Sequence, residues 1–304
     1  MNQVLPSFSI IIPTYERPEQ LHVCLDALVK LDYPHHLFEV IVVDDENNTP
    51  LGPIIAIYSN KMNLTLIRQT HGGPAAARNK GASNAKGDFL AFTDDDCIAS
   101  LDWLKVLASR FKDAPDCIIG GRTINYLIDN IYSATSQIII DIVYGHYNAK
   151  PNHSLFFASN NIALSKNIYT TIGGFDSSFL TSEDRDFCNR CLYHGFQMIY
   201  EPKAIIYHAH TLNLQTFSKQ HFNYGRGAFR YHLRRIQRGS GSFLEDLKFH
   251  LNLRNLFLYP FSQVNGYQVI PLASLLIIWQ LVNAAGFFWE AGSYASRTLS
   301  KTSL

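Results

Sequence analysis

Three adjacent carboxylates, Asp94, Asp95 and Asp96, are the residues of this sequence best suited to chemistry. They follow the apolar run Phe89–Phe92, which has the composition of a strand buried on both faces. The acids therefore fall at the carboxyl end of a strand, the edge where open α/β sheets bind ligands. If the strand continues, Asp94 and Asp96 share one orientation, and two oxygen ligands suit Mg²⁺ or Mn²⁺ held partly by phosphates. A solvated acidic turn is the alternative.

The segments before the acids form a β-α-β unit. Phe8–Ile12 is rich in β-branched residues and predicts a buried strand, and Pro18 begins an amphipathic helix. Phe38–Val43 predicts a second strand, parallel to the first because a helix connects them. The carboxyl ends of the two strands then bring Thr14, Tyr15 and Asp45 to the same edge of a sheet.

Two further segments suit binding. His71-Gly72-Gly73-Pro74 opens a helix predicted over Ala75–Ala85, where exposed backbone amides suit an anion, and Arg78 lies one turn in. An ordinary turn is the alternative. His208 and His210 follow the predicted strand Ala204–Tyr207 and share one face of an extended segment, which permits metal or phosphate contact. A purely structural histidine pair is the alternative.

A second acidic segment precedes the helical run Phe187–Tyr193. Thr181 or Ser182 could cap that helix, which would place Glu183 and Asp184 at its amino end, where the helix dipole favours their ionised form. Acids in a first helical turn are also common without function. Other strands are predicted at Leu64–Ile67, Cys117–Gly120 and Phe156–Leu164, and residues 122–152 show the weakest periodicity.

The C-terminal part differs in composition. Arg226, Arg230, Arg234 and Arg238 recur every fourth residue, which is one stripe on a helix, either solvated or facing an anionic lipid or diphosphate. Asn255–Trp289 contains no charged residue and no histidine, and is long enough for a spanning helix of about 20 residues. Prolines and glycines interrupt it, so a helical pair packed on the globular part is the competing interpretation. We favour attachment to a membrane surface.

The composition sets limits on the whole chain. With 304 residues, 47% of them hydrophobic, it can hold a catalytic domain over residues 1–215 and an appendage over 216–304. A formal net charge of +1 argues against nucleic-acid binding. Five cysteines without framework spacing indicate a reducing compartment, and Cys188 and Cys191 are expected to be apolar fillers. The first residues lack a signal-peptide pattern, so we expect a cytoplasmic protein at the inner face of the cell membrane.

Six short motifs together resemble the family 2 glycosyltransferases of the GT-A fold. They occur in the family's order over residues 8–210, and each is weak alone but specific jointly. The resemblance implies an α/β fold, with a mostly parallel sheet flanked by helices and a helical, apolar C-terminal appendage. The motifs are Pro13-Thr14-Tyr15-Glu16-Arg17-Pro18, Val43-Asp44-Asp45, Ala77-Arg78-Asn79-Lys80-Gly81, Phe92-Thr93-Asp94-Asp95-Asp96, Gly173-Gly174-Phe175-Asp176 and Glu183-Asp184.

The resemblance also implies roles for individual residues. The divalent cation, Mg²⁺ or Mn²⁺, is expected on Asp96, with Asp94 and His208 as the other residues of the metal site. Asp184 matches the family's general base, with Glu183 as its neighbour in the catalytic pair. The residues expected to contact the nucleotide sugar are Pro13, Thr14, Tyr15, Arg17, Asp45, Arg78, Asp94 and Asp95.

The expected reaction is metal-dependent transfer of one sugar from a nucleotide-diphosphate sugar, UDP- or GDP-linked, to a hydroxyl of a glycan, lipid-linked or small acceptor. Direct displacement assisted by one base inverts the anomeric centre. The Gln-x-x-Arg-Trp motif of processive synthases is missing, because Trp103, Trp279 and Trp289 are the only tryptophans and none follows that pattern. A nucleotidyltransferase acting on a sugar phosphate and a non-catalytic, membrane-docked binding module are the alternatives.

Overall fold

The computed structural model describes residues 5–150, 152–241, 249, 258–263, 266 and 269–302. The chain divides into two compact units that are interleaved in sequence. A domain boundary at residue 215 stays a prediction. The first unit contains Met1–Tyr126, Asn148–Ser177 and Phe187–His210, and the second contains Leu127–Tyr147, Ser178–Asp186 and Thr211–Leu304.

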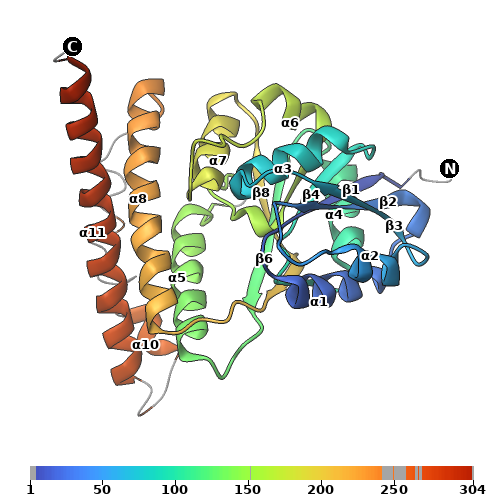
Figure 1. The fold of residues 1–304 in the computed structure, drawn as a ribbon, viewed down its shortest axis with the longest axis horizontal. Helices are drawn as coiled ribbons and strands as arrows, with labels where there is room; N and C mark the ends of the chain where they lie inside the picture. The colour runs from blue at the N-terminus through green and yellow to red at the C-terminus, as the bar shows by residue number, and fades with distance from the viewer. Residues whose placement is uncertain are drawn as a thin grey trace. The chain divides into compact units, whose positions relative to one another are not determined.

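The first unit is built on one mixed sheet (Figure 1). Its strands lie in the order β3-β2-β1-β4-β7-β6-β8-β5. Neighbouring strands from β3 to β4 are parallel, whereas β7 is antiparallel to both β4 and β6, and β5 is antiparallel to β8. This confirms the predicted GT-A-like, mostly parallel sheet. The strands are β1 Phe8–Thr14, β2 Phe38–Asp44, β3 Asn63–Arg68, β4 Phe89–Phe92, β5 Cys97–Ala99, β6 Ile118–Asn125, β7 Ile162–Ser165 and β8 Met198–His208.

Helices connect these strands and cover the sheet. Every residue of β1 and β2 is buried, and a hydrophobic core forms where α1 and α4 cover them. The helix α7 starts in the second unit and ends in the first. Within the first unit lie α1 Pro18–Val29, α2 Gly52–Tyr58, α3 Gly73–Asn84, α4 Trp103–Asp113 and α6 Lys166–Ile172, with short 3₁₀ helices at His35–Leu37 and Ser159–Asn161, and α7 covers Glu183–Tyr193.

Most predicted elements are present, with three corrections. The predicted strand Phe156–Leu164 is wrong at its start, because Ser159–Asn161 forms a 3₁₀ turn and β7 begins only at Ile162. The weakly periodic stretch 122–152 contains a long helix, α5. The third correction concerns the acids: β4 ends at Phe92, and Asp95 and Asp96 lie in a tight turn rather than in a continuing strand.

The turn has a physical reason. β5 begins at Cys97, directly after Asp96, and pairs antiparallel with β8, so the chain must leave β4 and change direction between the two strands. The register of this pairing places Cys97 opposite His208. The backbone amide of Ala209 also donates to the carbonyl of Asp96 at 2.8 Å. The end of β8 is therefore fixed beside the acidic turn.

The second unit contains a pair of long helices, α8 and α11, which run side by side (Figure 1). Its helices are α5 Ile131–Tyr147, α8 Leu214–Arg238, α10 Tyr259–Ser262 and α11 Val269–Thr302. A Cβ on Gly225 would lie 1.9 Å from the carbonyl oxygen of Asn283, and a Cβ on Gly286 would lie 1.9 Å from that of Phe222. Each glycine therefore lets the backbone of the other helix come close, and neither position has room for a side chain.

An ion-pair network links the same two helices. Glu290 of α11 is buried and accepts from Arg226 Nε at 2.8 Å and from Arg230 Nε at 2.8 Å. Arg238 pairs with the buried Asp186. Three of the four arginines in the predicted stripe thus form ion pairs inside the second unit. The predicted helical stripe is present: Arg226 and Arg230 face Glu290 of α11, Arg238 faces Asp186, and Arg234 is exposed.

The uncharged C-terminal stretch was predicted to start at Asn255, and Asn255–Phe257 lies outside the described residues. α11 continues through Asn283 and Gly286, with Pro271 in its first turn, so these residues do not interrupt the helix. Among the described residues, Val269–Thr298 of this helix is long and apolar enough to cross a membrane, by length and composition.

We expect Glu290→Gln to destabilise the protein at neutral pH by about 1 to 3 kcal/mol, because two arginines lose their charged partner. Burial raises the pKa of Glu290, but its hydrogen bonds to Arg226 and Arg230 outweigh burial and hold the pKa below 4.5. The stabilisation is therefore present above pH 4.5 and is lost as the pH falls through the lower, folded-state pKa.

Thermal unfolding from pH 7 to pH 3 checks this prediction. The difference between the wild-type protein and Glu290→Gln should shrink on acidification. Glu19→Gln, at an exposed glutamate in the first turn of α1, serves as the control and should have little effect at any pH. A difference for Glu290→Gln that stays constant down to pH 3 would contradict an ionic contribution.

Candidate functional site

Each acid of the turn has a cationic partner from another part of the first unit. Arg78 of α3 places Nη2 2.6 Å from Oδ1 of Asp94. Arg17, at the residue before α1, places Nη2 2.8 Å from Oδ1 of Asp95 and Nη1 2.7 Å from Oδ2 of Asp96. The counter-charge to the three carboxylates is therefore supplied by one arginine of α3 and one at the residue before α1.

Asp96 has a second partner, His208 at the end of β8, whose Nε2 lies 3.2 Å from Oδ1. Burial raises the pKa of Asp96, but attraction to His208 and Arg17 outweighs burial and holds the pKa well below its usual range. Burial lowers the pKa of His208, but Asp96 outweighs burial and raises it. Burial and the charge of His208 lower the pKa of His210 to about 4, so His210 is neutral at pH 7.

Asp95 differs from its neighbours because its side chain is 0% exposed. Burial raises its pKa to about 7, although Arg17 acts in the opposite direction. A carboxyl group with this pKa and no access to solvent is unsuited to contact a ligand directly. Asp94, at 23% exposed, is the most accessible acid of the three.

The residues around Asp96 fit a divalent cation. The ligand atoms of Asp96, Cys97 and His208 lie within 4.8 Å of one another. Burial raises the pKa of Cys97 well above its ordinary value, so the thiol stays protonated at neutral pH and is a poor metal ligand. Asp96 and His208 remain as an oxygen and a nitrogen donor, and a diphosphate and water can complete the coordination.

A second group of predicted residues lies at the ends of β1 and β2. The backbone amide of Asp45 donates to the carbonyl of Thr14 at 3.0 Å, which confirms that the two strand ends meet. Pro13 and Thr14 are buried within β1, whereas Tyr15 is 45% exposed. Of the first motif, Tyr15 and Glu16 are exposed at this edge and Arg17 is partly exposed.

The Asp45 carboxylate orders the loop that leads into α3. It accepts hydrogen bonds from the amides of Gly72 and Gly73, both at 2.9 Å, and from Nε2 of Gln69 at 2.7 Å. His71 from the same loop places Nδ1 3.0 Å from Oδ2 of Asp45, and its ring packs on Tyr15 with centroids 4.4 Å apart. Asp45 thus positions an exposed aromatic pair.

The glycine-glycine turn docks on α3. Nδ2 of Asn79 donates to the carbonyl of Phe175, and the amide of Phe175 donates to Oδ1 of Asn79, both at 2.8 Å. Gly173 and Gly174 have φ of +82° and +71°, which favours glycine. The Phe175 ring in turn packs on the Arg78 guanidinium, 5.6 Å from its centroid. The glycine-glycine turn therefore helps to hold the Arg78 side chain in place through the Phe175 ring.

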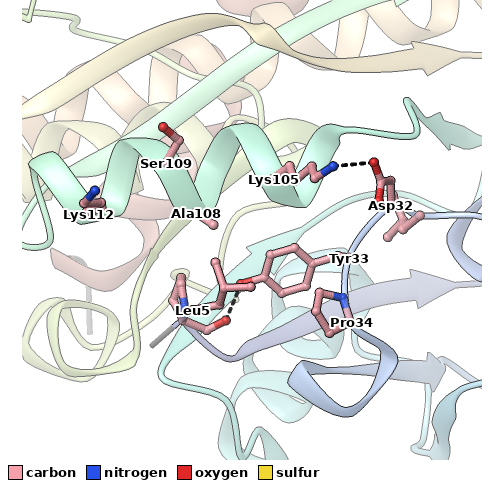
Figure 2. A pocket seen from close by; sticks show the side chains of 10 residues that line it. Leu5, Asp32, Tyr33, Pro34, Lys105, Ala108, Ser109 and Lys112 are labelled. Carbon is pink, nitrogen blue, oxygen red and sulfur yellow. Dashed lines mark hydrogen bonds and ion pairs between the residues drawn. The ribbon is translucent and has the colours of Figure 1, made fainter. Parts of the chain in front are cut away.

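A cavity of about 790 Å³ lies elsewhere in the first unit, between α4 and the turn after α1 (Figure 2). Figure 2 shows Lys105 paired with Asp32 at its rim, and the hydroxyl of Tyr33 donates to the carbonyl of Pro6. None of the described residues that line it belongs to the predicted site. This cavity is therefore distinct from the acidic turn.

Comparison with known proteins decides the family. The family model described as "Glycosyl transferase family 2" matches residues 9–177, which include all three acids of the turn, Arg17, Arg78 and the residues at the ends of β1 and β2, but not His208. The chain belongs to glycosyl transferase family 2. A model described as "Glycosyl transferase family group 2" matches residues 94–291. The protein is a glycosyltransferase that moves a sugar from a nucleotide sugar, which rules out both alternatives weighed from the sequence.

Individual proteins are also similar to this chain. Glycosyltransferase AglE of Haloferax volcanii is 27% identical over 237 residues, covering 75% of this chain and 74% of that protein. The mannosyltransferase PcManGT from Pyrobaculum calidifontis, solved with GDP-Man and Mn²⁺, aligns at TM-score 0.67 and 15% identity over 95% of this chain and 88% of its own. S. aureus TarS 1–349 with UDP-GlcNAc aligns at TM-score 0.55 and 17% identity over 95% and 92%.

The predicted catalytic pair of this family 2 enzyme lies in the second unit. Glu183 and Asp184 form the start of α7, and Glu183 is buried whereas Asp184 is partly exposed. Oδ1 of Asp184 accepts from the amide of Arg185 at 2.7 Å. Their roles in catalysis stay predictions.

Two residues of the site, Asn47 and His71, were not predicted from the sequence. The contacts of a third residue, Arg17, were not predicted either. Asn47 is buried, and its Nδ2 donates to the carbonyl of Thr14 at 3.2 Å and to Asp44 at 2.7 Å, so it joins the two strand ends. His71 was seen only as part of a helix entry, and its stacking on Tyr15 left no sequence signal. Arg17 was expected at the nucleotide, whereas its partners in the structure are Asp95 and Asp96.

We expect Asp96→Asn to weaken Mn²⁺ binding by at least about tenfold, because the residue loses the charge that a divalent cation requires. Isothermal titration calorimetry with MnCl₂ measures this. Asp102→Asn, at an exposed acid at the start of α4, is the matched control and should bind Mn²⁺ as the wild type does. Equal affinity in Asp96→Asn and wild type would exclude Asp96 as a ligand.

Proposed function

We propose that this family 2 glycosyltransferase transfers a single sugar from a UDP- or GDP-sugar to a hydroxyl acceptor, with inversion and with Mg²⁺ or Mn²⁺. The observation that carries the proposal is the acidic turn at the carboxyl edge of the sheet, where Asp96 lies against His208. The acceptor class is a glycan, a lipid-linked sugar or a small hydroxyl compound. The missing Gln-x-x-Arg-Trp motif supports transfer of one sugar rather than polymerisation.

In this proposal the first unit holds the donor. A divalent cation held by Asp96 and His208 would stabilise the charge that develops on the diphosphate leaving group. Asp94, the most exposed acid, lies at the entrance to this site and is fixed by Arg78. Tyr15, with His71 stacked on it, supplies an aromatic surface for the nucleotide base, and Asp45 keeps the loop that carries His71 in place.

The proposed general base is Asp184. Asp184 begins α7, where the helix dipole favours a carboxylate, and a carboxylate is already deprotonated at pH 7 and can accept the proton of an attacking hydroxyl. The preceding turn is held in a strained form: Ser182 has φ of +70°, and the Thr181 hydroxyl donates to the carbonyl of Asn223 of α8 at 2.8 Å. Strained backbone of this kind concentrates at functional sites, which supports a role for this turn.

A glycine of α8 makes room for the turn at Thr181 and Ser182. A Cβ on Gly227 would lie 2.5 Å from both the Ser182 hydroxyl and the Thr181 carbonyl oxygen. Glycine at this position therefore lets the turn approach the helix, and this contact positions Asp184 within the second unit.

The activity is tested by incubating the full chain with a panel of UDP- and GDP-sugars and Mn²⁺, and by measuring released nucleoside diphosphate. We expect one donor to release UDP or GDP in an acceptor-dependent manner, and NMR of the product to show inverted anomeric configuration. A product with retained configuration would overturn the single-base mechanism.

Asp184→Asn should lower transfer by roughly 10²- to 10⁴-fold, the usual contribution of a general base, while donor affinity changes little. The substitution preserves shape and removes the proton acceptor. Steady-state kinetics together with calorimetry of the donor separate the two quantities. Glu183→Gln is the control, because a buried neighbour should affect transfer less; if Glu183→Gln abolishes transfer and Asp184→Asn does not, the two roles are reversed.

We further propose that α11 attaches the protein to the cytoplasmic face of a membrane. Ile270, Ile277, Leu281 and Phe288 are spaced along one face of the helix and are 59% to 75% exposed. The exposed positions of the described stretch from Ile270 to Ser296 carry no charged side chain. On the opposite face Glu290 pairs with arginines of α8. The uncharged face is therefore the one that faces away from α8.

The chemistry of α8 favours attachment along the surface over a helix that spans the bilayer. Exposed positions of α8 include Gln215, Lys219 and Arg234, which are unfavourable in hydrocarbon. A helix with one apolar face and a polar partner on the other side matches binding in the plane of the interface. Residues 211–304 contain ten lysines and arginines against three aspartates and glutamates, which favours an anionic surface.

Substituting Ile277 and Leu281 together by Asn should reduce flotation of the full chain with phosphatidylglycerol-containing vesicles by several-fold, because about 25 cal/mol is lost for each Å² of apolar surface no longer buried in lipid. Ile236→Asn, at an exposed isoleucine of α8, is the matched control and should float as the wild type does. A wild-type chain that stays monomeric and does not float would show that the face has no lipid partner.

A further inference from the structure

We infer that Arg17 is a built-in counter-ion that occupies the place of the divalent cation on Asp96, and that it couples cation binding to the arrival of the nucleotide diphosphate. The inference rests on the proposed function, since it takes Asp96 as a metal ligand. One guanidinium bridges two neighbouring carboxylates, with Nη1 2.7 Å from Asp96 and Nη2 2.8 Å from Asp95.

The position of Arg17 is that of a competitor for the metal. Asp96 has two carboxylate oxygens: Oδ1 faces His208, and Oδ2 accepts the Arg17 hydrogen bond. The Asp96 side chain is 6% exposed, and Arg17 lies against the oxygen that His208 does not face. A metal ion placed beside this guanidinium would meet a like charge at close range in a poorly solvated site.

Arg17 can leave this place, whereas the other arginine of the site cannot. The Arg17 side chain is 41% exposed, and its long stem reaches the acids from the solvent side. Arg78, the partner of Asp94, is 4% exposed and packs against Phe175. The backbone before Arg17 is fixed, because the amide of Glu16, at φ of +56°, donates to Asn47. A fixed backbone with an exposed side chain permits rotation of the guanidinium without movement of the fold.

The group that Arg17 would meet on leaving Asp96 is anionic. The donor carries a diphosphate, and a guanidinium binds phosphate oxygens through paired hydrogen bonds. Cation and nucleotide therefore each favour the same displaced position of Arg17. Binding of one should strengthen binding of the other, and by linkage the strengthening is equal in both directions.

The test measures Mn²⁺ affinity of the full chain by calorimetry, with and without GDP or UDP. Without nucleotide, Arg17→Gln should bind Mn²⁺ at least about tenfold more tightly than wild type, since the competing charge is gone. With nucleotide present, the gain in Mn²⁺ affinity seen in the wild type should shrink in the variant. Arg68→Gln, at a 62% exposed arginine 3.8 Å from Asp44, removes the same charge at the same sheet edge and should leave both values unchanged.

Unchanged or weaker Mn²⁺ binding in Arg17→Gln would overturn the inference, because it would show that Arg17 only positions Asp96. Arg17→Lys provides a second measurement should the glutamine variant fail to fold. Lysine cannot bridge two carboxylates as a planar fork does, so Mn²⁺ should bind about threefold more tightly than in wild type, and no tightening would count against the inference. If neither wild type nor variant binds Mn²⁺, the metal site of the proposed function itself is wrong.

Discussion

Neutralising three consecutive carboxylates is the constraint on which the first unit depends. Two of them, Asp95 and Asp96, are almost fully removed from solvent, and an unpaired buried carboxylate costs several kcal/mol. The cations come from the residue before α1, from α3 and from the end of β8. These elements can meet only if the β-α-β order, the entry to α3 and the pairing of β5 with β8 all form together. The ion pairs of the acidic turn therefore form only when these parts of the fold have formed.

The second unit depends on the close approach of two helix backbones as well as on ion pairs. Gly225 and Gly286 bring the backbones of α8 and α11 together, and only at that distance can Glu290 reach two arginines of α8. A third glycine, Gly227, admits the turn that precedes Asp184. Small residues on α8 therefore determine both where its partner helix lies and where the acidic turn before α7 lies.

The sequence predicted the parts of the fold that short-range patterns encode. Runs of β-branched residues predict buried strands such as Phe8–Thr14, and Pro18 and Gly73-Pro74 predict the starts of helices. It could not predict that the strand stops before Asp94, because that depends on β5 pairing with a strand from the far end of the unit. For the same reason the motif order identified Asp96 and Arg17 as site residues but not as partners. Long-range pairings such as Asn79 with Phe175 likewise have no local signature.

The pairing of β5 with β8 also has a consequence for biogenesis. The acidic turn and β5 leave the ribosome early, but β8, which carries His208 and is the strand that β5 pairs with, is made only after another hundred or so residues. Closing so long a loop is entropically slow compared with forming the first β-α-β unit, which consists of neighbours in sequence. During synthesis the parallel half of the sheet can therefore be complete while the acids still face water. The pairing of β5 with β8 becomes the last part of the sheet to assemble, so the acidic turn and His208 meet only after β8 has emerged.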